Sequence, residues 1–356
     1  MGRVPHRHGA ALRHRRRRRS ARSQGAEEGQ GEHRAAEGDP QRAGDGRRHQ
    51  AGQLNPPDAA AALVEGPWEH RFISANGARF HVTSTGTGPV VLFVHGYPQF
   101  WWSWRDQLPA VAAAGYRAVA VDLRGFGASD KPPSGYDAPT ACDDLAAVIR
   151  SLGAERVALV GQGLGATFVW SMPTHHPGVT AAIAPIGMPH PAVFHHSMWR
   201  HPVQWRANRY LRAMQTPFAS ERQSVSVARR LHDWSGHDRS WITDEVERRY
   251  TEAMAFPFAG VAAAEYHRWF YRCRLTPTGL RYLQRVKAPV EVPVLHLHGA
   301  EDPTSLTTMA AECERHVTGP LEVRTVPGAG AFVPEEAPRT TNEALIAWLE
   351  AVHPAR

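Results

Sequence analysis

The heptapeptide Val160-Gly161-Gln162-Gly163-Leu164-Gly165-Ala166 carries the strongest structural signal in this 356-residue chain. It follows an apolar run, Arg156 to Leu159, that is typical of a strand, and it leads into a run with helical spacing. Two glycines that flank a central residue at this spacing are typical of a tight strand-to-helix turn that presents a nucleophile. The central residue is Gly163, which has no side-chain oxygen or sulfur. The sequence therefore predicts such a turn with its nucleophile position vacant.

Length and composition indicate a globular protein with a separate N-terminal segment. Hydrophobic residues make up 42% of the chain, which is enough for a sizeable core. Residues 1–60 hold 13 Arg and 7 acidic residues, and the remainder holds 28 basic and 27 acidic residues, so the net charge of +7 belongs mainly to the N-terminus. We expect residues 1–65 to be a disordered Arg/Gly-rich extension, which a GC-rich bacterial genome could add upstream of the functional protein.

Cysteine and apolar patterns argue against secretion and membrane insertion. Cys142, Cys273 and Cys313 are odd in number and widely spaced, which favours free thiols in a reducing, cytoplasmic compartment. No apolar run approaches the roughly 18 residues of a membrane span. The run Arg15 to Arg19 has no apolar region after it and no interleaved aromatic residues, so we expect neither an export signal nor a nucleic-acid partner.

The chain from Trp68 onward alternates strand and helix patterns. Asn76-Gly77 between two strand-like runs predicts a hairpin. The run Val90 to Val94 predicts a strand buried on both faces of a parallel sheet. Thr140 and Asp143 form a capping pair that predicts a helix through Leu152. This alternation is typical of a parallel α/β sheet.

Residues 190–288 interrupt this alternation. They are rich in aromatic residues, His and Arg at helical spacing, with few strand-like runs, so we expect a helical insertion. The sheet pattern resumes at Val292 to His298 and continues with a strand at Leu321 to Val326 and a final helix at about Thr340 to Val352. The core would then comprise residues 66–189 and 289–356.

Five motifs in order resemble those of one known family. They are His95 to Trp104, Asp122 to Ser129, Gly161 to Gly165, Gly299 to Asp302 and Gly328 to Pro338. Over about residues 66–353 the chain resembles the α/β hydrolases, with the closest likeness to the epoxide hydrolase and haloalkane dehalogenase branch. The resemblance implies an α/β-hydrolase fold, with a mostly parallel sheet and flanking helices, in which the insertion is a helical cap over an apolar pocket.

The resemblance also implies a catalytic triad, of which this chain keeps one member. In that branch an Asp attacks the substrate to form an ester, a His activates the water that hydrolyses the ester, and an acid orients the His. The nucleophile position corresponds to Gly163 and the base position to Ala331, so both are vacant. Only the acid position, Asp302, is filled.

Further site residues follow from the same resemblance. The backbone N–H groups of Tyr97 and Leu164 would form an oxyanion hole, with a cis peptide bond before Pro98. Tyr266 is the candidate lid tyrosine, although a packing role in an aromatic stripe fits it equally, and Tyr210 is a weaker second candidate. The expected pocket-lining residues are Pro98, Phe100, Trp101, Gln162 and His190, although capping or packing fits His190 better.

These observations predict a protein that binds a small hydrophobic molecule and cannot hydrolyse it through an ester. It would act as a binding protein or as a non-hydrolytic catalyst that uses Asp302, the oxyanion hole and Tyr266. The alternative is an active hydrolase of epoxides or esters in which a cap residue such as His190 replaces a lost group. No cofactor is implied, and no His, Asp and Glu set has the spacing of metal ligands.

Overall fold

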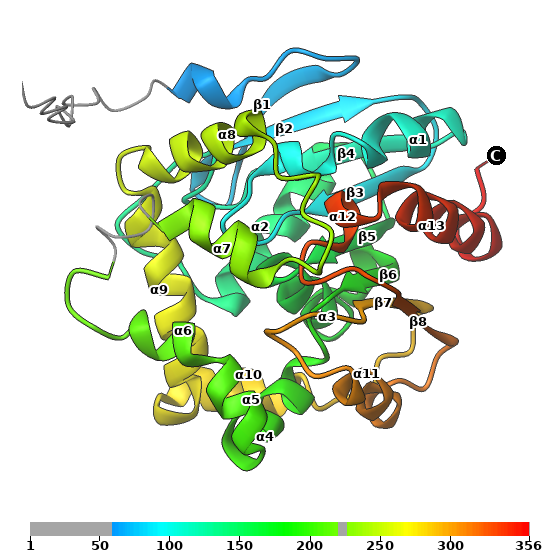
Figure 1. The fold of residues 1–356 in the computed structure, drawn as a ribbon. Helices are drawn as coiled ribbons and strands as arrows, with labels where there is room; N and C mark the ends of the chain where they lie inside the picture. Colours follow the sequence, from blue (N-terminus) through cyan, green and yellow to red (C-terminus); the bar gives the residue numbers. More distant parts are fainter. Residues whose placement is uncertain (1–58, 220–225, 356) are drawn as a thin grey trace, which may run out of the picture. The chain divides into compact units, whose positions relative to one another are not determined.

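The computed structural model describes residues 59–219 and 226–355, which form a mixed sheet flanked by helices (Figure 1). Within these residues the sheet has eight strands in the order β1-β2-β4-β3-β5-β6-β7-β8. The pairs β1·β2 and β2·β4 are antiparallel, and the other neighbours are parallel. The strands are β1 (Glu69–Ala75), β2 (Ala78–Thr85), β3 (Val90–Val94), β4 (Arg117–Val121), β5 (Val157–Gln162), β6 (Thr180–Ile186), β7 (Val294–Gly299) and β8 (Leu321–Val326).

The helices divide into those that connect strands or follow the last strand and those inserted between β6 and β7. The first set comprises α1 (Gln107–Ala113), α2 (Ala138–Ser151), α3 (Leu164–His175), α11 (Thr308–Glu312), α12 (Val333–Glu336) and α13 (Pro338–Val352). The inserted set comprises α4 (Pro191–Arg200), α5 (Pro202–Ala207), α6 (Arg209–Ala213), α7 (Val227–Trp234), α8 (Asp244–Ala255), α9 (Ala259–Arg272) and α10 (Pro277–Arg285). We call this inserted helical segment the cap; it is green to yellow in Figure 1.

The predicted hairpin is confirmed. Ala75 pairs with Ala78 across a two-residue turn formed by Asn76 and Gly77. Both turn residues have positive φ, 44° and 74°, which is the backbone that a type I′ turn requires. Asn and Gly tolerate this conformation better than other residues do, so the local sequence sets the register of β1 on β2.

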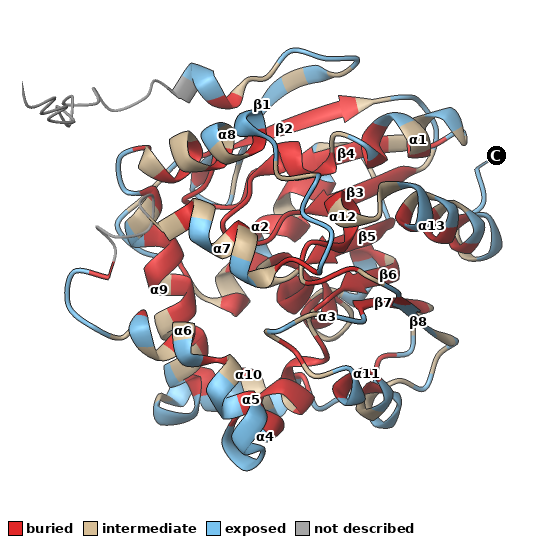
Figure 2. Cartoon of the chain, viewed as in Figure 1, coloured by how far each residue is buried: buried red, intermediate tan, exposed pale blue. Residues whose placement is uncertain are grey.

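The predicted buried strands are also confirmed. All five residues of β3 and all six of β5 are buried, and the two strands lie side by side in parallel (Figure 2). Parallel strands covered by helices on both faces lose contact with water on every side chain, which is why their sequences are continuously apolar. The strand-to-helix turn that begins at the end of β5 is therefore held by the most buried part of the sheet.

The predicted start of α2 is wrong by one turn of helix. Asp137, rather than Thr140, is the N-cap, and its carboxylate accepts from the Thr140 N–H at 2.9 Å and from the Thr140 hydroxyl at 2.9 Å. Pro139 at the second helical position explains the earlier start, because proline is favoured in the first turn, where an N–H group has no helical partner.

The expected N-terminal extension lies, up to residue 58, outside the described residues. Residues 59–65, which the sequence assigned to the same extension, contact the core. The Ala62 carbonyl accepts from Trp101 Nε1 at 2.7 Å, and the Val64 carbonyl accepts from Trp68 Nε1 at 2.8 Å. The part of the chain that packs on the core therefore includes residues before the predicted boundary at residue 66.

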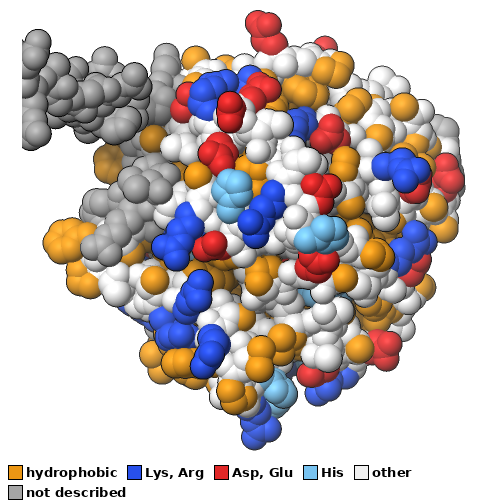
Figure 3. Space-filling model, viewed as in Figure 1, with side chains coloured by type: hydrophobic (Ala, Val, Ile, Leu, Met, Phe, Trp, Pro, Cys, Tyr) orange, Lys and Arg blue, Asp and Glu red, His pale blue; other side chains and the backbone are white. Residues whose placement is uncertain are grey.

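Surface charge and helix composition bear on possible partners. On the face drawn in Figure 3, acidic and basic side chains are interspersed, in keeping with the balanced charge of the sequence after residue 60. Within residues 59–219 and 226–355 we find no helix with the length and apolar character needed to cross a bilayer. The cytoplasmic compartment stays a prediction.

Candidate active site

The turn between β5 and α3 has the backbone of a nucleophile-bearing elbow. Gly163 adopts φ 52° and ψ −113°, and its N–H donates to the Ile186 carbonyl at 3.1 Å. The flanking glycines have no space for a side chain: a Cβ on Gly161 would lie 2.6 Å from Val169 Cγ2, and one on Gly165 would lie 2.3 Å from the Val94 carbonyl oxygen. The geometry of the turn therefore requires glycine at both flanking positions.

The central position differs from its neighbours because it has room. A Cβ on Gly163 would meet only the Gly96 Cα, at an ordinary contact distance of 3.8 Å. Positive φ is strained for any residue except glycine, by roughly 1–3 kcal/mol. Gly163 therefore relieves strain at a point where a side chain would otherwise fit and face a cavity.

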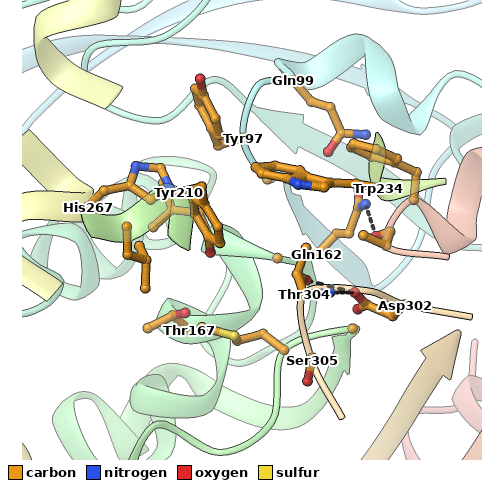
Figure 4. A pocket seen from close by; sticks show the side chains of 18 of the residues that line it. Tyr97, Gln99, Gln162, Thr167, Tyr210, Trp234, His267, Asp302, Thr304 and Ser305 are labelled. Atoms are coloured by element: carbon orange, nitrogen blue, oxygen red, sulfur yellow. Dashed lines mark hydrogen bonds between the residues drawn. The ribbon is translucent and has the colours of Figure 1, made fainter. Parts of the chain in front are cut away.

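This cavity lies between the sheet and the cap. Its volume is about 70 Å³, several times the roughly 10–15 Å³ that one water molecule requires. It is lined by Gly96, Tyr97, Gln99, Gln162, Gly163, Leu164, Thr167, Gly187, Met188, Tyr210, Leu211, Trp234, His267, Phe270, Asp302, Thr304, Ser305, Ala331 and Phe332. Figure 4 shows side chains that line it. The three triad positions of the sequence analysis, which are Gly163, Ala331 and Asp302, thus face one cavity.

Backbone hydrogen bonds fix the position of Ala331. Its N–H donates to the Trp234 carbonyl of the cap at 2.8 Å, and its carbonyl accepts from Gln162 Nε2 at 2.8 Å. The carboxylate of Glu336 accepts from the N–H groups on either side, those of Gly330 and Phe332, both at 2.8 Å. The loop is therefore fixed in place, and it presents only a methyl group at the base position.

Asp302 has a hydrogen-bond partner in its own loop. Its Oδ1 accepts from the Thr304 N–H and hydroxyl, both at 2.7 Å (Figure 4). Burial raises the pKa of the Asp302 carboxyl above its ordinary value, although His298 and the bonds from Thr304 act to lower it. No imidazole donates to this carboxyl in any hydrogen bond found among the described residues, and His298 instead bonds the Gly187 carbonyl at 3.1 Å.

The oxyanion-hole candidates Tyr97 and Leu164 both line the cavity. Leu164 is the first residue of α3, where backbone N–H groups have no partner within the helix and the helix dipole favours negative charge. The peptide bond between Tyr97 and Pro98 is cis, as expected. These donors are backbone groups, so they persist whatever side chain occupies position 163.

Tyr266, the candidate lid tyrosine, is not among the lining residues. Its ring packs against Phe126, Tyr136 and Phe168, with centroids 6.2, 5.3 and 5.5 Å away, and its hydroxyl is buried with no partner among the described residues. This is the packing role that the sequence left open. The weaker candidate, Tyr210, lines the cavity, and burial with Asp302 nearby raises the pKa of its hydroxyl.

Four of the five expected pocket residues also lie outside the cavity; only Gln162 lines it. Phe100 and Trp101 are buried in the core, and the Trp101 N–H donates to Asp122 at 2.8 Å. His190 caps α4 by accepting from the Ala192 N–H at 3.3 Å. Pro98, although it follows the lining residue Tyr97, does not contribute to the wall. The expectation that Pro98, Phe100 and Trp101 line the pocket is therefore wrong, whereas His190 has the capping role that the sequence favoured.

His267 and Trp234 are lining residues that the sequence did not single out. His267 lies on α9 next to Tyr266, and its Nδ1 donates to the Ala263 carbonyl at 2.6 Å. Burial lowers the pKa of His267 to about 4, so its ring is neutral at pH 7. The spacing of Ala263, His267 and Phe270 along one helix face was the signal that could have identified it.

The cap is joined to the core by buried and partly buried hydrogen bonds at three separate places. Tyr250 on α8 donates to Glu335 at 2.6 Å, where Arg105 and Gln99 also donate, at 2.6 and 2.5 Å. Gln204 on α5 donates to the Thr304 carbonyl at 2.7 Å and accepts from the Leu306 N–H at 3.1 Å. The Gly236 N–H donates to Glu336 at 2.7 Å. The cap, which covers the cavity, is therefore hydrogen-bonded to the core on more than one side.

Comparison with known proteins gives matches along most of the chain. The sequence pattern of the family described as "alpha/beta hydrolase fold" matches residues 89–338. Epoxide hydrolase 3 of Xenopus tropicalis is 32% identical over 295 residues, which cover 79% of this chain and 78% of that protein. The AB hydrolase superfamily protein YfhM of Bacillus subtilis is 28% identical over 293 residues, 79% of this chain and 97% of that protein. The structure of epoxide hydrolase A from Mycobacterium thermoresistibile superposes with a TM-score of 0.69 at 25% identity, over 80% of this chain and 99% of that one.

Proposed function

The chain belongs to the α/β-hydrolase family and is epoxide-hydrolase-like, and on that premise we propose that it binds a small hydrophobic molecule without hydrolysing it through a covalent ester. The observation that carries the proposal is the pair Gly163 and Ala331, which face the cavity at the nucleophile and base positions. Neither residue has a side chain that can attack carbon or accept a proton from water.

The expected deficit in rate is large. Loss of the nucleophile or the base from a triad enzyme lowers kcat by on the order of 10⁶, which corresponds to about 8 kcal/mol in the activation barrier. The two losses are not additive, because each residue acts only with the other. A protein with both changes keeps binding and backbone hydrogen bonding as its remaining functions.

Non-hydrolytic catalysis is compatible with the groups that remain. Asp302 and Tyr210 line the cavity and could hold or transfer a proton, and the N–H groups at the start of α3 could donate hydrogen bonds to developing negative charge. Tyr266 has no part in this proposal, because it lies outside the cavity. Elimination or rearrangement of a bound small molecule would need no nucleophile from position 163.

The alternative, an active hydrolase with a substitute base from the cap, has one candidate in His267. This residue lines the cavity, but its Nδ1 is bound to the Ala263 carbonyl rather than to Asp302. A general base that works on water is normally oriented by a carboxylate. We therefore favour the binding protein or non-hydrolytic catalyst.

The experiment is to restore the missing groups. Diol formation from styrene oxide is measured by chromatography for the parent, for Ala331→His and for Gly163→Asp combined with Ala331→His. We expect turnover only in the double variant, because position 163 has room for a Cβ and the oxyanion hole is retained. Hydrolysis by the parent at an ordinary enzymatic rate would overturn the proposal. The single variant Ala331→His is the matched control, because a base without a nucleophile restores no ester chemistry.

A further inference from the structure

One end of the cap exposes large apolar side chains to solvent. The helices α4, α5 and α6 lie together in the lower part of Figure 1, and Figure 2 shows much of their surface as exposed. Trp199 and Trp205 are 45% and 47% exposed, and Val203 between them is 65% exposed. Leu275, in the turn that follows α9, is 81% exposed. We define the cap-end patch as these apolar residues and the arginines that adjoin them in sequence or contact them, which are Trp199, Val203, Trp205, Leu275, Arg200, Arg206, Arg212 and Arg274.

The two chain segments that carry the patch lie side by side. Trp199 of α4 packs against Tyr271 of α9, with ring centroids 5.4 Å apart. Below this surface, the buried Cys273 Sγ contacts His195 Nε2 of α4 at 3.2 Å. The helix α5, which carries Trp205, contacts both α4 and α6. The patch is therefore one continuous end of the cap.

Charge is segregated into the same two segments. Residues 190–219 contain four arginines, and residues 266–290 contain five arginines and one lysine. Neither segment contains aspartate or glutamate, although the chain after residue 60 holds 28 basic and 27 acidic residues. Glu265 at the edge of the second segment and Glu312 on α11, which contacts α4, are each paired with an arginine, at 2.6 and 3.5 Å. In the lower part of Figure 3, basic and hydrophobic side chains adjoin over α4 to α6, so the patch is cationic as well as apolar.

Tryptophan and arginine side by side are typical of a surface that rests on a lipid bilayer. Indole rings favour the interface between headgroups and acyl chains, and aliphatic side chains leave water at the same depth. Each arginine near anionic headgroups strengthens binding by about fivefold. We propose that the cap-end patch docks the protein reversibly on a lipid surface that carries anionic headgroups. Docking of this kind needs no membrane-spanning helix, and it is independent of what the cavity binds.

Other occupants fit the patch less well. Nucleic acids stack their bases on open aromatic faces, but the guanidinium of Arg212 lies 3.7 Å from the centre of the Trp205 ring and covers one of its faces. The aliphatic members of the patch also gain little from a phosphate backbone. Residues 1–60 hold 13 Arg and 7 acidic residues, so they carry the same sign of charge as the patch and are repelled by it. A bilayer accommodates the apolar and the basic side chains at once.

The test is cosedimentation of the full chain with vesicles of phosphatidylcholine, either alone or mixed two to one with phosphatidylglycerol. The parent should bind the mixed vesicles about tenfold more tightly, and added salt should reduce the difference. Trp199→Ser combined with Trp205→Ser should weaken binding to mixed vesicles about tenfold, because two half-exposed rings no longer leave water. Phe72→Ser combined with Val323→Ser is the matched control, since these side chains are 44% and 37% exposed on β1 and β8, outside the cap, and binding should not change.

The contribution of charge is tested in the same assay. Arg206→Gln combined with Arg274→Gln should weaken binding to mixed vesicles about tenfold at low salt. Arg150→Gln combined with Arg339→Gln makes the same change of charge at exposed positions of α2 and α13, and it should have little effect.

Tryptophan fluorescence separates the patch from the N-terminal segment. Residues 1–60 contain no tryptophan, so lipids with brominated acyl chains quench emission only where a later part of the chain touches the bilayer. We expect quenching of the parent and its loss in the variant with serine at positions 199 and 205. Absence of quenching in a vesicle-bound parent would contradict the proposal.

Three further results would overturn the inference. The first is equal binding, or none, to the neutral and the mixed vesicles. The second is undiminished binding by the folded tryptophan variant, since adsorption would then belong to another part of the chain. The third is binding of duplex DNA, or self-association, that the Arg206 and Arg274 variant abolishes while vesicles stay unbound. If the tryptophan variant does not fold, Val203→Ser combined with Leu275→Ser takes its place, because both side chains are more than half exposed.

Discussion

Replacing His296 with leucine should make the protein more resistant to acid. His296 lies in β7 with a fully buried side chain, and neither ring nitrogen has a partner among the described residues. Its ring packs edge-on against Trp170 at 5.6 Å between centroids, and the ring of His298 lies at 6.1 Å. Burial, with a contribution from His298, lowers the pKa of His296 from 6.5 to about 3. The folded protein therefore keeps this imidazole neutral in mild acid.

The size of the effect follows from proton uptake by the unfolded chain. Below pH 6.5 the unfolded chain protonates this imidazole and the folded chain does not, so the free energy of unfolding falls with pH until about pH 3. The loss is about 1.4 kcal/mol for each pH unit in this window. Between pH 7.5 and pH 4.5 His296 alone removes about 2.7 kcal/mol, a large share of the roughly 5–15 kcal/mol of a typical domain.

The assay is urea unfolding followed by tryptophan fluorescence at several pH values between 7.5 and 4.5. The parent and His296→Leu are compared at each pH, because the buried carboxyl of Asp302 has a raised pKa and contributes with the opposite sign in both proteins. The advantage of the variant should grow steadily as the pH falls. His196→Leu, at an exposed position in α4, is the control and should show no such growth. An advantage that stays constant within about 0.5 kcal/mol across the range would refute the reasoning.

Three further predictions concern the elbow and the buried ion pair. Gly163→Asp alone should form an ester with styrene oxide and fail to hydrolyse it, because position 331 has no base. Intact-protein mass spectrometry should show the mass of the protein plus one substrate molecule. An unmodified protein would contradict this prediction. Gly165→Ala should prevent folding, since its Cβ would lie 2.3 Å from the Val94 carbonyl oxygen. Gly163→Ala should lower the free energy of unfolding, measured in urea, by only about 1–3 kcal/mol. Equal losses of stability in the two variants would argue against the described turn. Arg105→Met should lower stability by about 3–5 kcal/mol in the same assay, because it leaves Glu335 buried without its cation, and a loss under about 1 kcal/mol would show that the pair behaves as an exposed one.

The sequence predicted the parts of the fold that local chemistry controls. The short, Val-rich apolar run of β3 favours a strand covered on both faces, and Asn76-Gly77 can adopt the positive φ of the hairpin. The three positions that the resemblance assigns to a triad, Gly163, Asp302 and Ala331, could be located because each lies after a strand at a short offset from a glycine. All three face the same cavity in the structure.

The roles of the cap residues were harder to predict, because burial alone does not show whether a side chain faces the cavity or the core. Glu265, Arg268 and Arg272 mark the outer side of α9, but Tyr266 and His267 are both buried on the inner side, so burial does not say which of the two faces the cavity. One residue along a helix turns the side chain by about 100°. That rotation places His267 in the cavity and Tyr266 against the core. The same ambiguity affected Trp101, whose aromatic ring is as suited to a core as to a pocket.

The hydrogen bonds that join the cap to the core have a consequence for the speed of ligand exchange. A rigid rotation of the cap would break the bonds of Tyr250, Gln204 and Gly236 together and take their core partners from the fully buried side chains of Tyr250 and Gln204. Each buried polar group that loses its partner costs about 1–3 kcal/mol, so this rotation is a rare event. Ligand exchange would then proceed by small local movements of single side chains, and the observed association rate should reach a plateau at high ligand concentration, set by how often the protein opens and not by how often the two molecules meet.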